Sequence, residues 1–231
     1  MKTKQHLIWD LPLRLFHWLF AIAIVGAWYT SDQDNDLIEY HMLLGYFIFG
    51  LVIFRVVWGF IGTKHARFSS FIPSFSRLIN YIKHFNDSEQ KPSVGHNPLG
   101  SLMVVVMIVL ALLQAISGLF MNDEIFSSGP YYGSVSDEVD KVMSILHHNV
   151  FDYLIAAIVA HLVAIAFYYK VKKNNLVTPM ITGKKSANQV NKADSISHSK
   201  LVLAIVLAIF VGAFIFWLVV INAPVLEEYY Y

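Results

Sequence analysis

Residues 146–169 have the sequence LHHNVFDYLIAAIVAHLVAIAFYY, which places two histidines on one long apolar segment. His147 and His161 are fourteen residues apart, which is close to four turns of a helix at 3.6 residues per turn. Both side chains should therefore face the same way, roughly 21 Å apart along the helix axis. A histidine inside a membrane span is costly and marks a functional site. The spacing suits one ligand near each face of a bilayer whose hydrocarbon core is roughly 30 Å thick.

The composition is that of an integral membrane protein. Of the 231 residues, 56% are hydrophobic and 14% are charged, whereas about a quarter of the residues in a soluble domain are charged. The chain contains no cysteine, which excludes disulfides, thiolate-held metal centres and covalently attached haem. Any metal must be held by His, Met or carboxylate groups. We expect membrane lipid around the chain and no nucleic-acid partner.

Five apolar segments are long enough to cross a bilayer as helices. We expect them at about residues 11–29, 41–61, 97–121, 144–169 and 201–221. Asp10 and Pro12 precede or open the first, and Asn97 and Pro98 begin the third, as N-terminal signals of a helix. The N-terminal segment has no signal-peptide cleavage site, so it is expected to be retained as a span.

The expected fold is therefore an all-α integral membrane protein. Residues 1–185 should form a four-helix transmembrane bundle. Residues 186–200 are polar and lack apolar periodicity, which predicts a flexible cytoplasmic linker. Residues 201–231 should form a fifth C-terminal transmembrane helix with a short periplasmic tail.

Charged residues are distributed unevenly between the two sides of these spans. Fifteen Lys and Arg residues lie at the N-terminus or in the second and fourth connecting segments, and Lys141 alone lies on the other side. The positive-inside rule then predicts a multi-pass protein with a cytoplasmic N-terminus and a C-terminus on the outer side, which is the periplasm if the membrane is a bacterial inner membrane. The periplasmic side carries eleven acidic residues: Asp32, Asp34, Asp36, Glu39, Asp123, Glu124, Asp137, Glu138, Asp140, Glu227 and Glu228. This surface is either an ordinary solvated face or a docking face for a basic partner.

Four histidines form two pairs when they are sorted by expected depth. His17 and His161 lie toward the cytoplasm, and His41 and His147 lie toward the periplasm. Two imidazoles that face each other across a bundle core can take both axial positions of a haem iron. Each of them alone could instead be a polar residue near the membrane interface. His148 is the alternative to His147, although its position on the helix turns it about 140° away from His161.

Three further residues are candidates for contact with a haem. Arg55 follows His41 by fourteen residues, which puts it at the depth of the inner pair. An intramembrane arginine needs a counter-charge, which a haem propionate would supply; the alternative is an arginine that snorkels to the interface. Arg14, one turn before His17, is a second propionate candidate. Gly45, one turn after His41, lacks a side chain where a planar group would approach the backbone.

Taken together, these motifs resemble the bacterial cytochrome b561 and Ni/Fe-hydrogenase b-type cytochrome family. The resemblance covers roughly residues 8–185 and is carried by WDLPLRLFHW (9–18), HMLLGYFIFGLVIFRVVWGFIG (41–62), ARFSSF (66–71), GHNPLG (95–100), the helix with His147 and His161, and PMITGKK (179–185). It implies two haem b groups with His17, His41, His147 and His161 as axial ligands. The sequence departs from the family at His148, where an acidic residue is frequent, and in its fifth span.

The resemblance also implies a function, which is respiratory electron transfer between the quinone pool and a redox partner. A periplasmic c-type cytochrome and a hydrogenase are both expected as candidate partners. Some family members resemble superoxide-handling quinone reductases, which would make the chain an enzyme. A proton or metal-ion transporter that uses the histidines as a relay is a further alternative, although no span is interrupted at its centre by Gly and Pro.

His96 belongs to the GHNPLG motif just before the third span. Its ring could cap that helix, bind a propionate or line a quinone site. Capping and loop structure rank first, because Asn97 and Pro98 already have the sequence of a helix start.

Overall fold

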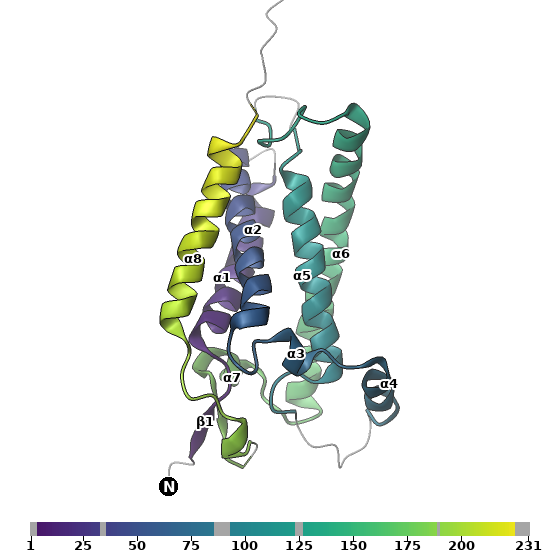
Figure 1. The fold of residues 1–231 in the computed structure, drawn as a ribbon. Helices are drawn as coiled ribbons and strands as arrows, with labels where there is room; N and C mark the ends of the chain where they lie inside the picture. Colours follow the sequence, from purple (N-terminus) through teal and green to yellow (C-terminus); the bar gives the residue numbers. More distant parts are fainter. Residues whose placement is uncertain (1–3, 33–35, 86–92, 123–126, 189, 225–231) are drawn as a thin grey trace, which may run out of the picture. The chain divides into compact units, whose positions relative to one another are not determined.

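The computed structural model describes residues 4–32, 36–85, 93–122, 127–188 and 190–224. Within these residues, five helices are long and apolar enough to cross a membrane (Figure 1). They are α1 (Leu11–Thr30), α2 (Ile38–Ile61), α5 (Pro98–Gly118), α6 (Asp137–Lys170) and α8 (Leu201–Phe216), which continues as a π-helical turn, η3 (Trp217–Ile221). The chain is therefore an all-α integral membrane protein, as its sequence predicts.

Two helix ends differ from the predicted ones: the start of α6, where acidic residues extend the helix, and the end of α5, where a turn follows. α6 begins about two turns earlier than predicted, at Asp137, because its first turn carries Asp137, Glu138 and Asp140. Carboxylates at this end of a helix are stabilised by the helix dipole and by the unpaired backbone N–H groups. α5 ends at Gly118, where the chain leaves the helix through a turn.

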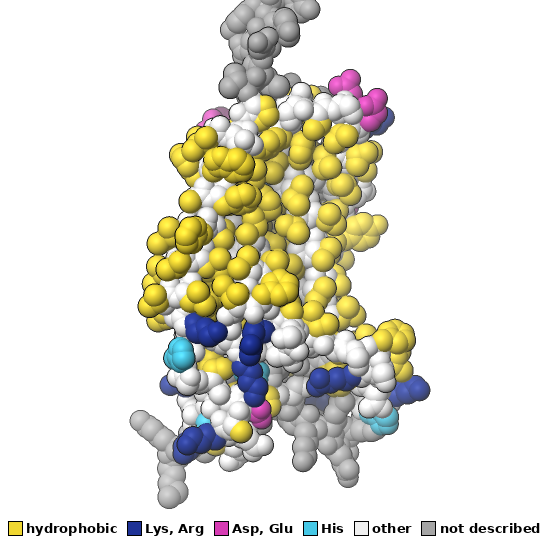
Figure 2. Space-filling view, viewed as in Figure 1, with side chains coloured by type: hydrophobic (Ala, Val, Ile, Leu, Met, Phe, Trp, Pro, Cys, Tyr) yellow, Lys and Arg dark blue, Asp and Glu magenta, His cyan; other side chains and the backbone are white. Residues whose placement is uncertain are grey.

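The chain divides into two compact units, and each spanning helix contributes to both. Unit 1 comprises Met1–His17, Arg55–Met107 and Ala157–Ile205; unit 2 comprises Trp18–Phe54, Ile108–Ala156 and Val206–Tyr231. On the face shown in Figure 2, Lys and Arg side chains gather at the loop end of unit 1, and Asp and Glu side chains gather at the loop end of unit 2. Of the predicted acidic face, five residues lie outside the described ones: Asp34, Asp123, Glu124, Glu227 and Glu228.

Unit 1 also contains short elements that the sequence does not predict. They are β1 (Gln5–Leu7), α3 (Phe68–Phe71), α4 (Phe75–Lys83), α7 (Val177–Thr182) and β2 (Lys184–Ser186). β1 and β2 pair antiparallel, with His6 opposite Lys185. Gly183 joins α7 to β2 at a φ of +79°, and its carbonyl oxygen accepts the Ile8 N–H at 2.8 Å. Strands of three residues are too short for an alternating pattern to reveal them.

The expectation of a flexible linker at residues 186–200 needs correction. The Ala187 N–H donates to the Lys4 carbonyl oxygen at 2.8 Å, and the Ile196 N–H donates to the Leu7 carbonyl oxygen at 2.9 Å. The described part of this segment is therefore attached to the N-terminal strand by its backbone. Polar composition did not reveal this, because the partners lie far away in the sequence.

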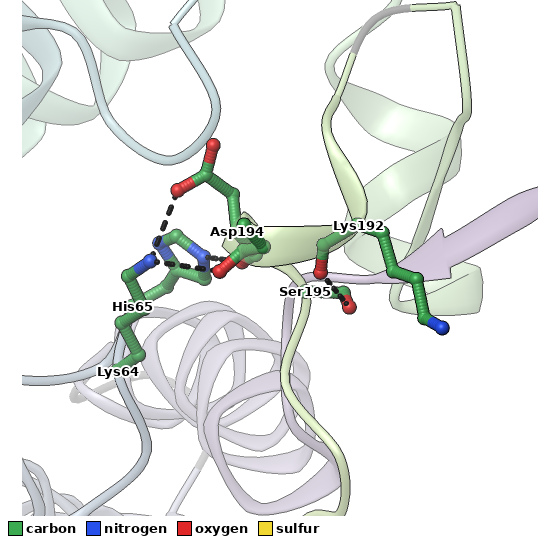
Figure 3. Close-up of polar contacts among 6 residues, drawn as sticks. Lys64, His65, Lys192, Asp194 and Ser195 are labelled. Atoms are coloured by element: carbon green, nitrogen blue, oxygen red, sulfur yellow. Dashed lines mark hydrogen bonds and ion pairs between the residues drawn. The ribbon is translucent and has the colours of Figure 1, made fainter.

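A short 3-10 turn in the same segment, η2 (Lys192–Asp194), is attached to the loop after α2 (Figure 3). His65 Nε2 donates to the Asp194 carbonyl oxygen at 2.7 Å, and Lys64 Nζ lies 3.0 Å from the Asp194 carboxylate. Burial lowers the pKa of His65, so this ring is neutral in the contact. The Lys64–Asp194 pair is solvent-exposed and contributes at most about 1 kcal/mol.

Asp10 organises the start of α1. Its side chain is 1% exposed, and its carboxylate accepts the Leu13 N–H at 2.7 Å, which makes Asp10 the N-cap of the helix. Trp58 Nε1, at 3.3 Å, and Thr63 Oγ1 donate to the same carboxylate. The buried charge is thus satisfied, and the start of α1 is joined to the end of α2.

Candidate functional site

Each unit brings together two histidines from different helices. In unit 1 the ring centroids of His17 on α1 and His161 on α6 lie 6.4 Å apart. In unit 2 the centroids of His41 on α2 and His147 on α6 lie 6.2 Å apart. α6 is continuous through both of its histidines and supplies one ring to each unit. The structure thus contains the two pairs that the sequence spacing predicts.

The separation of each pair suits one metal ion between the rings. An imidazole nitrogen lies about 2 Å from a transition metal that it ligates and its ring centre about 1 Å farther, so rings on opposite sides of one ion have centroids about 6 Å apart. Among the described residues, no group of three or more His, Asp or Glu side chains is arranged to hold a metal ion. Two side chains per site suit an iron whose other four ligands come from a porphyrin.

Backbone carbonyl groups hold both rings of unit 2 in a defined orientation. His41 Nδ1 lies 2.8 Å from the Ala27 carbonyl oxygen, and His147 Nδ1 lies 3.1 Å from the Gln114 carbonyl oxygen. Because a carbonyl oxygen only accepts hydrogen bonds, each Nδ1 carries the proton and each Nε2 keeps its lone pair. Metal-ligating histidines are held in this way in most metal sites.

Gly118 and Ser117 complete the surroundings of the His147 ring. A Cβ at Gly118 would lie 2.9 Å from His147 Cε1, so only glycine leaves room for the ring in this position. The Ser117 hydroxyl lies 3.2 Å from His147 Nδ1 and donates to the Gln114 carbonyl oxygen at 3.1 Å. The sequence reasoning missed Ser117, because no motif marks it.

A cavity of about 550 Å³ in unit 2 is lined by both rings of the pair, His41 and His147. Gly45 also lines it, and a Cβ at this position would meet nothing within 4 Å, so the backbone of α2 faces open space here. Gln114 Oε1 is buried and has no hydrogen-bond partner among the described residues. The residues present therefore fit a planar cofactor between the rings.

His148 takes a different position from His147. It lines the same cavity, but its Nδ1 donates to the Ser144 carbonyl oxygen of its own helix at 2.8 Å. His147 is the ring that faces His41. The geometry thus favours His147 over His148 as a partner of His41.

Arg55 in unit 1 is buried, with 1% of its surface exposed, so its side chain does not snorkel to the interface. Its guanidinium carbon lies 5.0 Å from the ring centroid of Phe68 and 5.8 Å from that of Phe71. Nη1 and Nη2 have no hydrogen-bond partner among the described residues. The buried Asp10 carboxylate is the other charge of this region, and it accepts hydrogen bonds from Leu13 and Trp58. A buried cation with free donors is able to bind an acidic group from outside the chain, such as a propionate.

Arg14, the second propionate candidate, has a partner in the chain. One guanidinium nitrogen donates to the Ile181 carbonyl oxygen of α7. A Cβ at Gly183 would lie 3.0 Å from Arg14 Nε, so the turn after α7 approaches the guanidinium closely. Arg14 thus joins α1 to α7, and its contact with a propionate stays a prediction.

The His96 ring packs between aromatic side chains and does not cap α5. Its centroid lies 4.7 Å from that of Trp9 and 4.9 Å from that of Phe71. The cap is Asn97, whose side-chain oxygen accepts a backbone N–H of the first turn at 2.7 Å. Burial and, to a smaller extent, the charge of Arg55 lower the pKa of His96 to about 3. The ring is therefore neutral at physiological pH.

Comparison with known proteins identifies the family. A family model described as prokaryotic cytochrome b561 matches residues 8–183. Probable Ni/Fe-hydrogenase B-type cytochrome subunits are similar to this chain: that of Azotobacter chroococcum mcd 1 is 26% identical, with 76% of this chain and 86% of that protein covered. The subunit of Rhodobacter capsulatus is 22% identical, with 78% of this chain and 80% of that protein covered. The subunit of Rhizobium leguminosarum bv. viciae matches a shorter stretch; it is 30% identical, with 51% of this chain and 59% of that protein covered.

The spanning helices and the family match define a membrane b-type cytochrome, a class of haem proteins that takes part in electron transfer. The chain belongs to the prokaryotic cytochrome b561 family. Its haem b is held without thioether bonds, because the chain has no cysteine to form them.

Replacing Gly118 by valine is expected to displace the His147 ring, because even a Cβ would lie 2.9 Å from it. The visible absorption and electron paramagnetic resonance spectra of bound haem should change, and part of the haem should be lost. Gly212→Val on α8 is the matched control, because a Cβ at Gly212 meets nothing within 4 Å. Unchanged spectra in Gly118→Val would contradict this position of the ring.

Proposed function

We propose that the chain is a dihaem electron carrier of the bacterial inner membrane, which passes electrons between the quinone pool and a redox partner. The observation that carries this proposal is the presence of two histidine pairs with ring separations of 6.4 and 6.2 Å. His17 and His161 would ligate one haem iron, and His41 and His147 the other. Haem iron, when bound, would supply one-electron transfer, and with two histidines as ligands it would have no open position for oxygen or substrate.

In this proposal the side chains of the protein hold the sites in place and set their electrostatics. The carbonyl groups of Ala27 and Gln114 keep two rings protonated at Nδ1, so that Nε2 can act as the ligand. The buried positive charge of Arg55 would pair with a propionate and favour the reduced state of the nearby haem. Because α6 supplies one ring to each pair, a single helix connects the two sites.

The orientation of the chain follows from its charges. The basic loops of unit 1 would lie in the cytoplasm, and the acidic loops of unit 2 in the periplasm. The pair in unit 1 would then exchange electrons near the cytoplasmic face, and the pair in unit 2 near the periplasmic face. Electrons would cross the membrane between them.

A hydrogenase is the partner that the relatives favour, because several of them are named Ni/Fe-hydrogenase B-type cytochrome subunits. Oxidation of H₂ releases two electrons and two protons, and reduction of a quinone to a quinol takes up two electrons and two protons. The chain would connect these two reactions by passing one electron at a time. A basic periplasmic c-type cytochrome is the alternative partner, supported by the acidic residues of unit 2.

The haem content is expected to fall from two per chain to one in His161→Ala and also to one in His41→Ala, since each variant removes one ligand of a different pair. The pyridine haemochrome assay on purified protein measures it, with circular dichroism to check the helices. His198→Ala, an exposed histidine outside the spans, is the control. One haem in the unmodified protein would refute the proposal, as would loss of both haems from a folded single variant.

Arg55→Leu is expected to lower one of two midpoint potentials, because a buried positive charge opposes oxidation of a nearby iron. A redox titration followed by absorption would detect a shift of about 60 mV, which corresponds to about 1.4 kcal/mol for a one-electron couple. Arg55→Lys keeps the charge and should shift the same potential less. Two unchanged midpoints in Arg55→Leu would remove the support for a propionate contact.

H₂ is expected to reduce the haem in native membranes, and this reduction should disappear when the hydrogenase is removed. Dithionite should still reduce the haem fully, which controls for loss of the cytochrome itself. The outcome that rejects the hydrogenase partner is no reduction by H₂, combined with rapid reduction by a basic c-type cytochrome. In that case the rate should fall steeply as salt is raised.

A further inference from the structure

We propose that α4 lies in the interface of the bilayer. Its apolar face would contact the boundary between headgroups and acyl chains, and its basic side chains would contact anionic lipid headgroups. Neither histidine pair uses this surface.

Contacts on one side of α4 fix it beside the last turn of α6. The Tyr81 and Tyr168 hydroxyls are hydrogen-bonded at 2.7 Å. Just beyond α4, the Phe85 ring stacks on that of Phe167 with centroids 5.7 Å apart and planes inclined by 20°. Lys172 Nζ donates to the Phe85 carbonyl oxygen at 2.6 Å. α4 is therefore held against a membrane-spanning helix by one of its sides.

The last turn of α6 has the features of a membrane interface. α6 has 34 residues, so it is about 51 Å long, which exceeds the roughly 30 Å of a hydrocarbon core. Its end carries Phe167, Tyr168 and Tyr169, and Tyr169 is exposed. Aromatic side chains gather at the headgroup level of membrane proteins. The segment with α4 also begins and ends at spanning helices, α2 and α5, which keeps it close to the membrane surface.

The other side of α4 presents apolar side chains that no described part of the chain covers. Phe75, Ile79 and Ile82 are 79%, 37% and 50% exposed. At 100° per residue these three positions fall within an arc of about 60°. Asn80 and Arg77 lie on the polar side of the helix and are exposed. The helix is thus amphipathic, with its apolar face outward.

The charge of this segment selects anionic lipid as the partner. Residues 62–85 contain Lys64, Arg67, Arg77 and Lys83 and no Asp or Glu. Figure 2 shows hydrophobic and basic side chains next to one another on the surface over α4. On α4, Arg77 lies opposite the apolar face, and Lys83 flanks that face, about 40° from Ile79 at 100° per residue. Phe and Ile on one face, with basic residues beside or opposite it, are typical of helices that lie in the membrane interface. Basic residues near a bilayer surface are attracted by its anionic lipids.

A position of α4 in the membrane interface would also affect the surroundings of Arg55 in unit 1. α3, four residues upstream, carries Phe68 and Phe71, whose rings contact the guanidinium of Arg55. Between α3 and α4 lies a short connection that includes Pro73. Anchoring α4 to the bilayer would therefore hold α3 over Arg55.

Spin labelling tests the proposal, because the chain has no native cysteine. Single variants Phe75→Cys, Ile79→Cys and Ile82→Cys, with Asn80→Cys as the matched control, are labelled in the haem-loaded, full-length protein. The protein is reconstituted in vesicles of phosphatidylcholine and phosphatidylglycerol. Oxygen partitions into acyl chains and a nickel chelate stays in water, so the ratio of their collision rates should be several-fold higher at residues 75, 79 and 82 than at residue 80. An unchanged haem spectrum checks the fold of each variant.

Two results at residue 75 would overturn the proposal. A ratio equal to that at residue 80 means that the face lies in water, and low collision rates with both reagents mean that protein covers it. A second comparison tests the headgroups. With the label at residue 75, the nickel collision rate should rise when Arg77→Gln and Lys83→Gln are combined, and also when phosphatidylglycerol is omitted. No rise in either case would refute the role of anionic lipid.

Discussion

A histidine ring inside an apolar bundle has two nitrogens, and a ring that ligates a metal through one of them must still satisfy the other. In unit 2 the backbone meets this constraint, because the carbonyl oxygens of Ala27 and Gln114 accept from the Nδ1 of His41 and His147. A carbonyl oxygen has two lone pairs, so it can serve a ring in addition to its helix. Gly118 then leaves the space that the His147 ring needs. The residues that surround the His147 ring thus meet two needs of the ring, a hydrogen-bond acceptor for Nδ1 and space beside Cε1.

Among the described residues of unit 1, two charged side chains are almost completely buried, and they differ in how they are satisfied. Asp10 and Arg55 are each 1% exposed. The Asp10 carboxylate accepts hydrogen bonds from α1, from α2 and from Thr63 in the loop after α2, so its role is structural. Arg55 has aromatic rings beside it and no hydrogen-bond partner for its terminal nitrogens among the described residues. This difference supports the proposal that Arg55 pairs with an acidic group from outside the chain, whereas Asp10 is satisfied within the fold.

The connecting segments of unit 1 contribute to the packing around these charges. α3 covers Arg55, and His96 packs between Trp9 and Phe71. The chain after β2 is attached to the N-terminal strand and to the loop after α2. These contacts join segments far apart in the sequence, so the loops of this unit are part of its structure and not only connections between spans.

The spans and the two histidine pairs were predictable from the sequence alone, because both depend on local regularities: the length of an apolar run, and the fourteen-residue interval that brings side chains back to one face of a helix. Tertiary structure decided the rest. Only folding could show that His148 donates to its own helix, that Arg55 is buried, and that Ser117 contacts a ring. The strands, α4 and the attached segment before α8 also escaped prediction. Each depends on partners distant in the chain, which periodicity and composition do not record.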